Sequence, residues 1–204
     1  MKIAVYGGTF SPPHIGHERA IEALFGRFLP DRMIIMPAGI PPHKTLCEGV
    51  SGALRLEMCR AAFENVIPRA EISAFEVEKE GKSYSIDTVR HFAPYGDVTL
   101  FIGDDMLFSL DTWHRAEELF AKCSFVAVPR HLDTLEKMRD FAERLHEKYG
   151  ARITVFDTAV TEISSTEVRE QIRRDGFSPY VRDEVMDIIR KNGLYGCLSA
   201  HEAE

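Results

Sequence analysis

No stretch of this sequence is apolar for long enough to cross a membrane, and its four cysteines show no CxxC spacing. A spanning helix needs about 20 consecutive apolar residues, so we expect no membrane partner. The opening segment, MKIAVYGG, has only five residues between the first Met and a glycine pair, too short for the apolar core of a signal peptide. The cysteines also lack metal-type clustering, so we expect reduced thiols in a cytoplasmic protein.

The sequence also lacks an excess of positive charge, an internal repeat and a low-complexity tract. Its formal net charge is -7 and its pI is near 5.6, so no global field exists to hold a nucleic-acid backbone. We therefore expect no nucleic-acid partner, and an anionic substrate must be bound by local geometry. The length of 204 residues favours one domain, which we place at residues 1–196, before a polar tail at 197–204.

What the sequence does contain is an alternation of short apolar or β-branched segments with longer segments of helical spacing. Helical spacing is clear at Ile21, Leu24, Phe25 and Phe28, and again from Leu135 to Leu145. The expected strands are 2–6, 32–37, 70–77, 97–103, 123–129 and 151–157. This alternation predicts an α/β fold, with a doubly wound, mostly parallel sheet and helices on both faces.

Ligands of such sheets bind beyond the carboxyl ends of the strands. The two segments richest in turn-forming residues, 7–14 and 37–44, each follow an expected strand. We therefore expect both segments to border the same cleft.

The densest group of polar and turn-forming residues is GGTFSPPHIGH at positions 7–17. Gly7 and Gly8 allow the backbone to approach a ligand closely or to take a positive φ, and Thr9 adds a hydroxyl. His14 and His17 stand three apart where a helix should begin, so both can face the same way. The free N–H groups and the dipole at a helix start favour phosphate. The alternative, an ordinary turn with capping histidines, leaves this concentration of residue types unexplained.

A second helix start of similar chemistry lies at Ser164, Ser165 and Thr166. Glu167 completes a capping-box pattern. The same helix end can bind phosphate, and Arg169 stands one turn in, where a guanidinium can reach a polyphosphate. A surface arginine on a capped helix is the alternative interpretation.

These motifs resemble the HxGH nucleotidyltransferase superfamily, whose tetrapeptide is HIGH at residues 14–17. HIGH alone also occurs in class I aminoacyl-tRNA synthetases. The further segments that look like the bacterial nicotinate-nucleotide adenylyltransferase family are PAGIPPHK (37–44), GKSYSIDTV (81–89), GDDMLFSLDTW (103–113), ISSTEVR (163–169) and IIRKNGLY (188–195). The resemblance implies a Rossmann-like nucleotidyltransferase fold and an enzyme of NAD biosynthesis. Such an enzyme transfers AMP from ATP to nicotinate mononucleotide and releases pyrophosphate.

The resemblance also implies where each substrate binds. The ATP-binding residues by this correspondence are Gly7, Gly8, Thr9, Phe10, His17, Asp104, Ser164, Ser165, Thr166 and Arg169. The acceptor-binding residues are His43, Lys44, Ser85, Thr88 and Trp113, with Trp113 stacking on the pyridine ring. The catalytic residues are His14, His17, Lys44 and Arg169. By composition alone, Lys44 would be a solvated loop lysine and Trp113 a core residue.

The chemistry that the resemblance implies needs no protein nucleophile, because the acceptor phosphate is ionised at neutral pH and can attack in line. Mg²⁺ is expected to bind through the ATP phosphates, with no metal site of the protein's own. Two residues depart from the family pattern. Ser11 stands where aspartate is usual, and Ser85 stands where threonine is usual.

Two alternatives from different classes stay open. One is another small HxGH adenylyl- or cytidylyltransferase, against which Trp113 and the PPHK segment argue. The other is a non-catalytic nucleotide-binding module, against which the intact HIGH and ISSTEVR segments argue. A homo-oligomer and the choice between nicotinate and nicotinamide also stay open.

Overall fold

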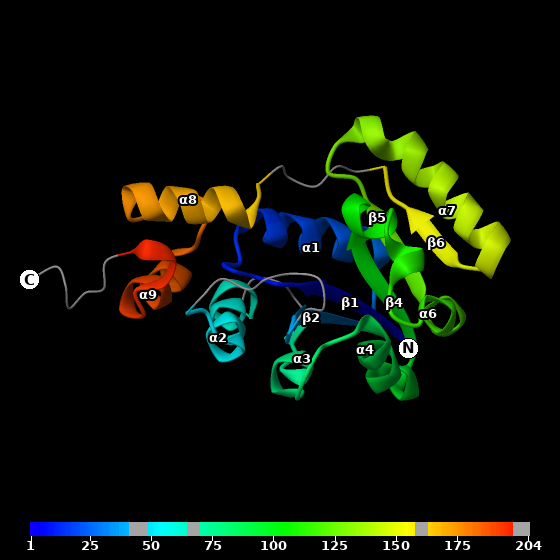
Figure 1. Ribbon diagram of the computed structural model, residues 1–204, viewed down its shortest axis with the longest axis horizontal. Helices are drawn as coiled ribbons and strands as arrows, with labels where there is room; N and C mark the ends of the chain where they lie inside the picture. The colour runs from blue at the N-terminus through cyan, green and yellow to red at the C-terminus, as the bar shows by residue number, and fades with distance from the viewer. Residues whose placement is uncertain (41–48, 65–69, 158–162, 198–204) are drawn as a thin grey trace, which may run out of the picture.

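The computed structural model describes residues 1–40, 49–64, 70–157 and 163–197 (Figure 1). Its centre is a six-stranded sheet in the order β3-β2-β1-β4-β5-β6, and every pair of neighbouring strands is parallel. The strands are β1 Lys2–Gly8, β2 Arg32–Pro37, β3 Ala70–Ile72, β4 Asp97–Gly103, β5 Ser124–Val128 and β6 Arg152–Val155. The predicted doubly wound parallel sheet is confirmed.

Helices connect successive strands, and two more follow the last strand. The α-helices are α1 Ile15–Phe28, α2 Gly52–Phe63, α3 Phe75–Glu78, α4 Ser85–Phe92, α5 Asp104–Leu107, α6 Ala116–Lys122, α7 Leu135–Tyr149, α8 Ser165–Asp175 and α9 Asp183–Lys191. Short 3-10 turns are η1 Ala93–Tyr95, η2 Leu110–Thr112, η3 Leu132–Thr134 and η4 Leu194–Gly196. None of the helices among the described residues is long and apolar enough to span a bilayer.

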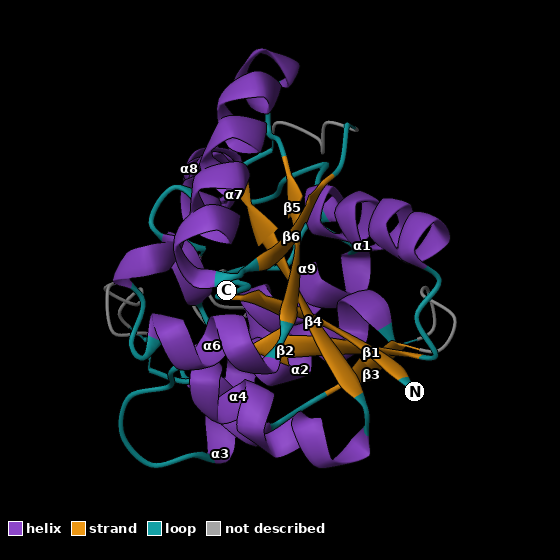
Figure 2. Cartoon of the chain, turned by 90° about the vertical axis from the view of Figure 1, so that its right-hand side faces the viewer, coloured by secondary structure: helices purple, strands orange, loops and turns teal. Residues whose placement is uncertain are grey.

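The helices cover both faces of the sheet because successive strand residues point to opposite sides. Ile3 and Val5 of β1 belong to one core cluster, whereas Ala4 between them belongs to the other. The Ala4 cluster takes its helical residues from α1, α2, α8 and α9, and the Ile3 cluster takes them mainly from α4, α6 and α7. Figure 2 shows the strands as a twisted sheet in the middle of the molecule, with helices around it.

The two helices after β6 pack on the face that α1 and α2 cover. Val168 and Ile172 of α8, and Val185 and Ile189 of α9, are fully buried in that cluster. Figure 1 shows α8 and α9 next to one another near the C-terminus, with α9 close to α2. This packing brings the end of the chain back to the helix that follows β1.

Three details differ from the sequence-based expectations. Only Ala70–Ile72 of the expected strand 70–77 pairs with β2, and Phe75–Glu78 forms helix α3 instead. Gly7 and Gly8 are the last two residues of β1, and the positive φ in this loop falls on Phe10. Cys197, the first residue of the predicted tail, packs against the core, and residues 198–204 lie outside the described part of the chain.

Candidate active site

The candidate site lies at the carboxyl ends of β1 and β4, which are neighbours in the centre of the sheet. The chain passes from β1 to β2 on one side and from β4 to β5 on the other, so strand order reverses between them. Open α/β sheets bind ligands at such a switch point. The described parts of the loops after β1 and β2 also meet there, because the Ala38 N–H donates to the Gly8 carbonyl at 2.8 Å. The two segments are therefore adjacent over these residues, and residues 41–44 of the second lie outside the described part of the chain.

His14 and His17 are brought together at the start of α1. His14 is the N-cap residue, and the two imidazole ring centroids are 3.7 Å apart. The His14 backbone N–H points at His17 Nδ1 over 3.3 Å. Gly16 makes this pairing sterically possible, since a Cβ at that position would lie 3.0 Å from His14 Nδ1 and 3.3 Å from the Ile163 Cβ.

Both imidazoles are neutral near pH 7 when no substrate is bound. Burial lowers the pKa of His14 to about 4, against a small opposing effect of Glu167. Burial also lowers the pKa of His17 well below its ordinary value, and the charges of His14 and Arg130 add to this. Among the described residues, the buried His14 Nδ1 has no hydrogen-bond partner. The site therefore holds a buried polar nitrogen that the protein itself does not satisfy.

The first turn of α1 is held in place by the segment before α9. Arg182 donates to the Glu18 carboxylate through two guanidinium nitrogens, from Nη2 at 2.5 Å and from Nε at 3.0 Å. The Ile15 N–H donates to the Tyr180 carbonyl at 2.8 Å. A bidentate pair of this kind fixes orientation as well as distance, so the position of the histidines depends on residues more than 160 positions further along the chain.

Buried contacts of Phe10 and Ser11 hold the loop between β1 and α1 in place. The Phe10 ring is buried and packs against His17 and Phe63, so the side chain belongs to the core. The Ser11 hydroxyl lies 3.0 Å from the Tyr195 hydroxyl in a buried contact. The serine at the family's aspartate position thus binds a tyrosine of the closing IIRKNGLY segment.

The start of α8 lies directly against this loop. Arg169 donates to the Ser11 carbonyl at 2.8 Å and to the Thr166 hydroxyl at 3.0 Å. The Ser165 hydroxyl reaches the Pro12 carbonyl at 3.4 Å. The HIGH and ISSTEVR segments, about 150 residues apart in the sequence, are therefore neighbours at the cleft, and two helix N-termini meet there.

The capping box expected at α8 is present. The Ser164 hydroxyl accepts from the Glu167 N–H at 3.2 Å, and the Glu167 carboxylate accepts from the Ser164 N–H at 2.9 Å. The capping role and the position at the cleft are both found in this segment. Since α8 has no other described N-terminal cap, Ser164 decides where the helix begins.

A small cavity of about 40 Å³ lies between β1, β4, α3 and α4. Its lining includes three of the predicted acceptor-binding residues, Ser85, Thr88 and Trp113, together with Gly7. Thr88 is buried, and its hydroxyl donates to the Glu76 carboxylate at 2.5 Å. The cavity has space for about one water molecule, so a planar ring can enter only when a lining side chain such as Trp113 moves.

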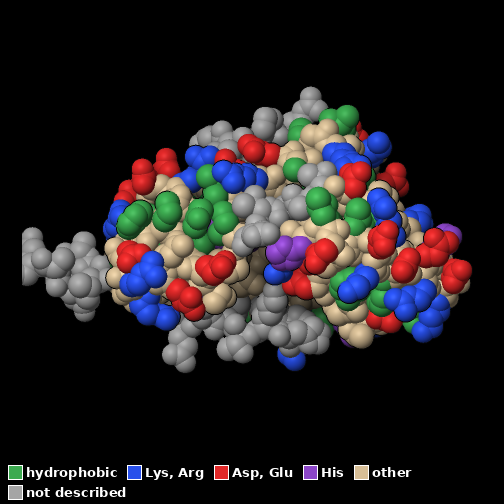
Figure 3. Space-filling model, turned by 90° about the horizontal axis from the view of Figure 1, so that it is seen from above, with side chains coloured by type: hydrophobic (Ala, Val, Ile, Leu, Met, Phe, Trp, Pro, Cys, Tyr) green, Lys and Arg blue, Asp and Glu red, His purple; other side chains and the backbone are tan. Residues whose placement is uncertain are grey.

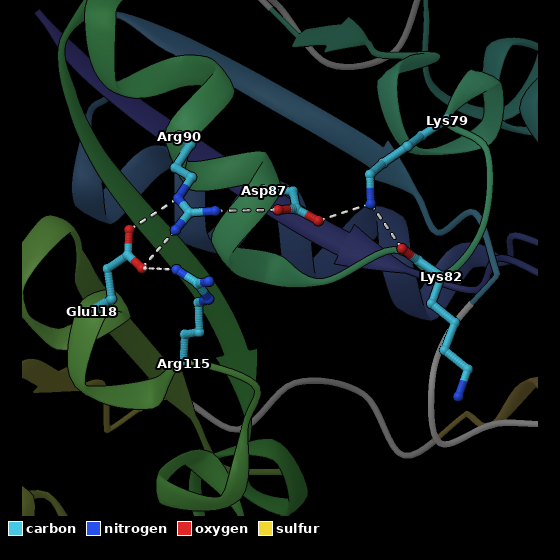
Figure 4. A network of polar contacts seen from close by, with 6 residues as sticks. All are labelled: Lys79, Lys82, Asp87, Arg90, Arg115 and Glu118. Carbon is cyan, nitrogen blue, oxygen red and sulfur yellow. Dashed lines mark hydrogen bonds and ion pairs between the residues drawn. The ribbon is translucent and has the colours of Figure 1, made fainter.

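The segment that carries Trp113 is braced against α4 by the network in Figure 4. Arg90 of α4 binds Glu118 of α6 at 2.7 Å and Asp87 at 3.7 Å, and Arg115 binds the same Glu118 at 3.2 Å. Lys79 extends the network from the end of α3 to Asp87 at 2.8 Å. These contacts tie together the elements on either side of the cavity.

The Asp104 carboxylate is occupied by protein groups. It accepts from the Asp105 N–H at 2.9 Å and from the Arg130 N–H at 3.3 Å. The Arg130 guanidinium lies 3.7 Å from Asp104 and 2.9 Å from Asp105. Asp104 stands at the end of β4, where the sequence predicts it, but its two oxygens already accept hydrogen bonds.

Sequence reasoning missed two charged groups at the cleft. Arg130 follows β5 directly, and its place after a parallel strand was the signal that could have found it. Glu76 was assigned to a strand, whereas it lies in α3 and lines the cavity beside Trp113. Burial raises the pKa of Glu76, although the bonds from Thr88 and the Gly39 N–H oppose this.

Two predicted residues, His43 and Lys44, lie outside the described residues. In the described part of the chain, no three His, Cys, Asp or Glu side chains come close enough together to hold a metal ion. Figure 3 shows acidic and basic side chains intermixed over the face seen from above, with histidine side chains near its middle, beside a hollow.

The fold and the two opposed helix starts define a nucleotidyltransferase of the HxGH type. In agreement, residues 5–171 match the cytidylyltransferase-like family. The chain is 36% identical to a protein of Caldicellulosiruptor saccharolyticus over 96% of this chain and 99% of that one. It is 37% identical to a protein of Exiguobacterium sibiricum with the same coverage of both. Both relatives are named "Probable nicotinate-nucleotide adenylyltransferase".

The chain belongs to the nicotinate-nucleotide adenylyltransferase family, and it is an enzyme of the nucleotidyltransferase class. Solved structures agree at the level of the fold. The Plasmodium falciparum nicotinic acid mononucleotide adenylyltransferase complexed with NaAD superposes with a TM-score of 0.76 at 18% identity, over 96% of this chain and 98% of that one.

Proposed function

We propose that this chain transfers AMP from ATP to nicotinate mononucleotide, with ATP bound between the starts of α1 and α8 and the acceptor ring in the cavity beside Trp113. The observation that carries this proposal is the contact between the HIGH loop and the start of α8, through Arg169 and Ser11 at 2.8 Å. Two helix N-termini, two histidines and an arginine at one place suit a polyphosphate.

On the ATP side, His14, His17 and Arg169 act on the phosphates. Neutral imidazoles donate one N–H each, and a bound polyphosphate raises the pKa of both rings because its negative charge favours the imidazolium. Thr9, Ser165 and Thr166 add hydroxyl donors around the same space. Gly7, Gly8 and Phe10 contribute backbone, Ser164 sets the start of α8, and Asp104 holds the end of β4 in place.

On the acceptor side, Trp113 supplies an aromatic plane for the pyridine ring, and Ser85 and Thr88 line the opposite wall. His43 and Lys44, which lie outside the described residues, are proposed to bind the acceptor phosphate, with Lys44 also acting in catalysis. This arrangement places the ring end of the acceptor at the bottom of the cleft and its phosphate toward ATP.

In the chemical step, an oxygen of the acceptor 5'-phosphate attacks the α-phosphorus of ATP. The bond from the α-phosphorus to the bridging oxygen breaks, and pyrophosphate leaves with the electron pair. No protein group forms a covalent bond. Positioning of the two substrates and stabilisation of charge on the transferring and leaving phosphates account for the rate.

Mg²⁺ fits this site as an ion held by ATP rather than by a protein cage. Histidine and arginine dominate the phosphate side, and Mg²⁺ prefers phosphate and water oxygens to these groups. When bound, it neutralises phosphate charge and orients the leaving group. We also propose a cytoplasmic location, one domain over residues 1–196, and no nucleic-acid partner. Oligomeric state stays open.

The test is pyrophosphate release by the wild type and by His17→Ala with ATP and either nicotinate or nicotinamide mononucleotide. The wild type should turn over with ATP and prefer the nicotinate form in kcat/KM. Removal of one preorganised donor costs about 100-fold or more in kcat, so H17A should lose at least this much while its circular dichroism stays unchanged.

His146→Ala is the matched control, because His146 lies on α7 and bonds only the Ala151 carbonyl among the described contacts. It should keep wild-type kcat. Turnover with CTP instead of ATP would point to a cytidylyltransferase, and no pyrophosphate release with any pair would point to a binding module. A folded H17A with wild-type turnover contradicts the role of the histidine.

A further inference from the structure

Arg55 of α2 is among the largest fully buried side chains of the molecule, with 1% of its surface exposed. Arginine is almost never buried to this extent unless it is paired. Nothing in the GALRLEMCRAAF pattern of α2 distinguishes it from Arg60, which is exposed on the same helix. Only the tertiary structure therefore distinguishes the buried Arg55 from the exposed Arg60.

The Arg55 guanidinium joins the two loops that border the cleft. Nη1 donates to the Thr9 carbonyl at 3.0 Å, and Nη2 donates to the Gly39 carbonyl at 3.0 Å. Thr9 follows β1 and leads into the HIGH helix, and Gly39 follows β2. The planar fork of the guanidinium thus fixes the distance between two loops. The proposed ATP-binding residues begin on the first loop, and the second leads to the proposed acceptor cavity.

No carboxylate of the described residues is in contact with the charge of Arg55. Within the described residues no ion pair involves Arg55, and its Nε has no hydrogen-bond partner. Burial lowers the pKa of the guanidinium, and Cys59, Tyr195 and Glu76 only partly oppose this through charge interactions. A buried cation that meets only neutral carbonyls costs free energy in the substrate-free protein, and an anion bound above it offsets that cost.

The Gly39 side of the fork continues to the acceptor cavity. A Cβ on Gly39 would lie 2.0 Å from the Glu76 carbonyl oxygen and 2.3 Å from the Ser83 Oγ, so this backbone is pressed against α3 and the start of α4. The nearby Gly39 N–H lowers the pKa of the Glu76 carboxyl, and the same carboxylate accepts from Thr88. Contacts therefore run without a gap from Thr9 through Arg55 and Gly39 to the wall of the cavity.

We propose that Arg55 is a positioning residue for both substrates. It holds the loop after β1, which contacts ATP, at a fixed distance from the Gly39 loop, which packs against the acceptor cavity. Its charge attracts the phosphates bound between the two loops. This inference rests on the proposed function for the identity of the substrates. Lysine cannot replace it, because a single ammonium lacks the planar fork that spans two carbonyls. Loss of the fork should loosen both loops at once.

The test compares Arg55→Lys and Arg55→Gln with Thr88→Val and Arg60→Lys. KM for ATP, KM for the acceptor and kcat are measured, together with ATP binding by calorimetry, which needs no turnover. We expect R55K to raise KM for both substrates about tenfold or more, since small misplacements weaken every contact of a bound substrate. R55Q, which also loses the charge, should bind ATP more weakly than R55K.

T88V removes a hydroxyl at the cavity and leaves both hydrogen bonds of Arg55 in place, so it should raise KM for the acceptor and leave ATP binding unchanged. R60K changes an exposed arginine of the same helix and should behave as the wild type. The proposal is overturned if folded R55K keeps wild-type KM for both substrates, if only one KM changes, or if R55K loses its fold. If the wild type binds ATP but does not use the acceptor, the proposed function is overturned instead. In that case the ATP affinities of R55K and R60K still show whether Arg55 positions the ATP-binding loop.

Discussion

At the scale of single residues, the site is built from polar groups that the protein buries without fully satisfying. His14 Nδ1 and Arg55 Nε are the two buried polar atoms that lack a partner among the described residues, and both lie beside the loop after β1. A buried unsatisfied polar group costs about 1–3 kcal/mol, so the substrate-free site is less stable than an apolar one would be.

The low pKa of His14 makes stability depend on pH. The unfolded chain takes up a proton on this histidine near its ordinary pKa of 6.5, whereas the folded protein resists until about pH 4. Stability is therefore present above about pH 6.5 and is lost as the pH falls toward 4. Urea unfolding should show a loss of about 2 kcal/mol from this residue between pH about 7 and about 5.

His14→Gln should remove the contribution of His14 to this pH dependence of the unfolding free energy, and the contributions of the other titrating groups should remain. His146→Gln is the control, because it removes a histidine from α7 and should retain the wild-type difference between the two pH values. Identical pH dependence in H14Q and the wild type would mean that burial does not hold the His14 imidazole neutral.

At the scale of elements, we assign two roles to the start of α8: it caps its own helix, and it contributes to the proposed ATP site. A matched pair of variants separates these roles. Ser164 caps α8 beside the cleft, and Ser51 caps α2 by accepting from the Leu54 N–H at 3.2 Å. Replacing either serine by alanine should cost about 1 kcal/mol of stability, as loss of an N-cap does. Chemical denaturation measures this for both.

Only Ser164→Ala should also raise KM for ATP, because the first turns of α8 contact the loop after β1 through Ser165 and Arg169, whereas no described hydrogen bond joins Ser51 to that loop. Equal KM values for S164A, S51A and the wild type would show that the capping task is the whole role of Ser164. A KM change in both variants would instead indicate a general response to lost stability.

At the scale of the whole molecule, the two cores on either side of the sheet each bury a free thiol. Cys59 and Cys123 are 0% and 1% exposed, and Cys197 is partly exposed. Burial raises the pKa of Cys59, and it raises the pKa of Cys123 to about 12. A thiol that is neither ionised nor accessible reacts only when the structure around it opens.

Among the three cysteines of the described residues, thiol labelling followed by peptide mapping should therefore modify Cys197 first and leave Cys59 and Cys123 protected until the protein unfolds. ATP at about 100 times its Kd stabilises the folded state by about 2.7 kcal/mol, so labelling of both should slow by about 100-fold. If the Cys59 peptide were modified as fast as the Cys197 peptide, the core packing described for α2 would be wrong.

The sequence by itself determined the class of fold and the two helix starts that we propose bind phosphate. Hydrophobic periodicity is local, so strands such as β1 and β4 and helices such as α1 and α7 follow from their own residues. The caps are local as well, since Ser164 and Glu167 are only three residues apart. For the same reason the HIGH and ISSTEVR motifs carry their chemistry in short segments.

Only the tertiary structure decided which of these local pieces meet. It buried Arg55 beneath Thr9 and Gly39, turned Glu76 toward Thr88 from a helix instead of a strand, and set Arg130 against Asp104. Each contact joins residues from different elements, so strand order and helix packing decide it. The sequence can propose single polar residues near a strand end or a helix start, but only the fold decides which partners they meet.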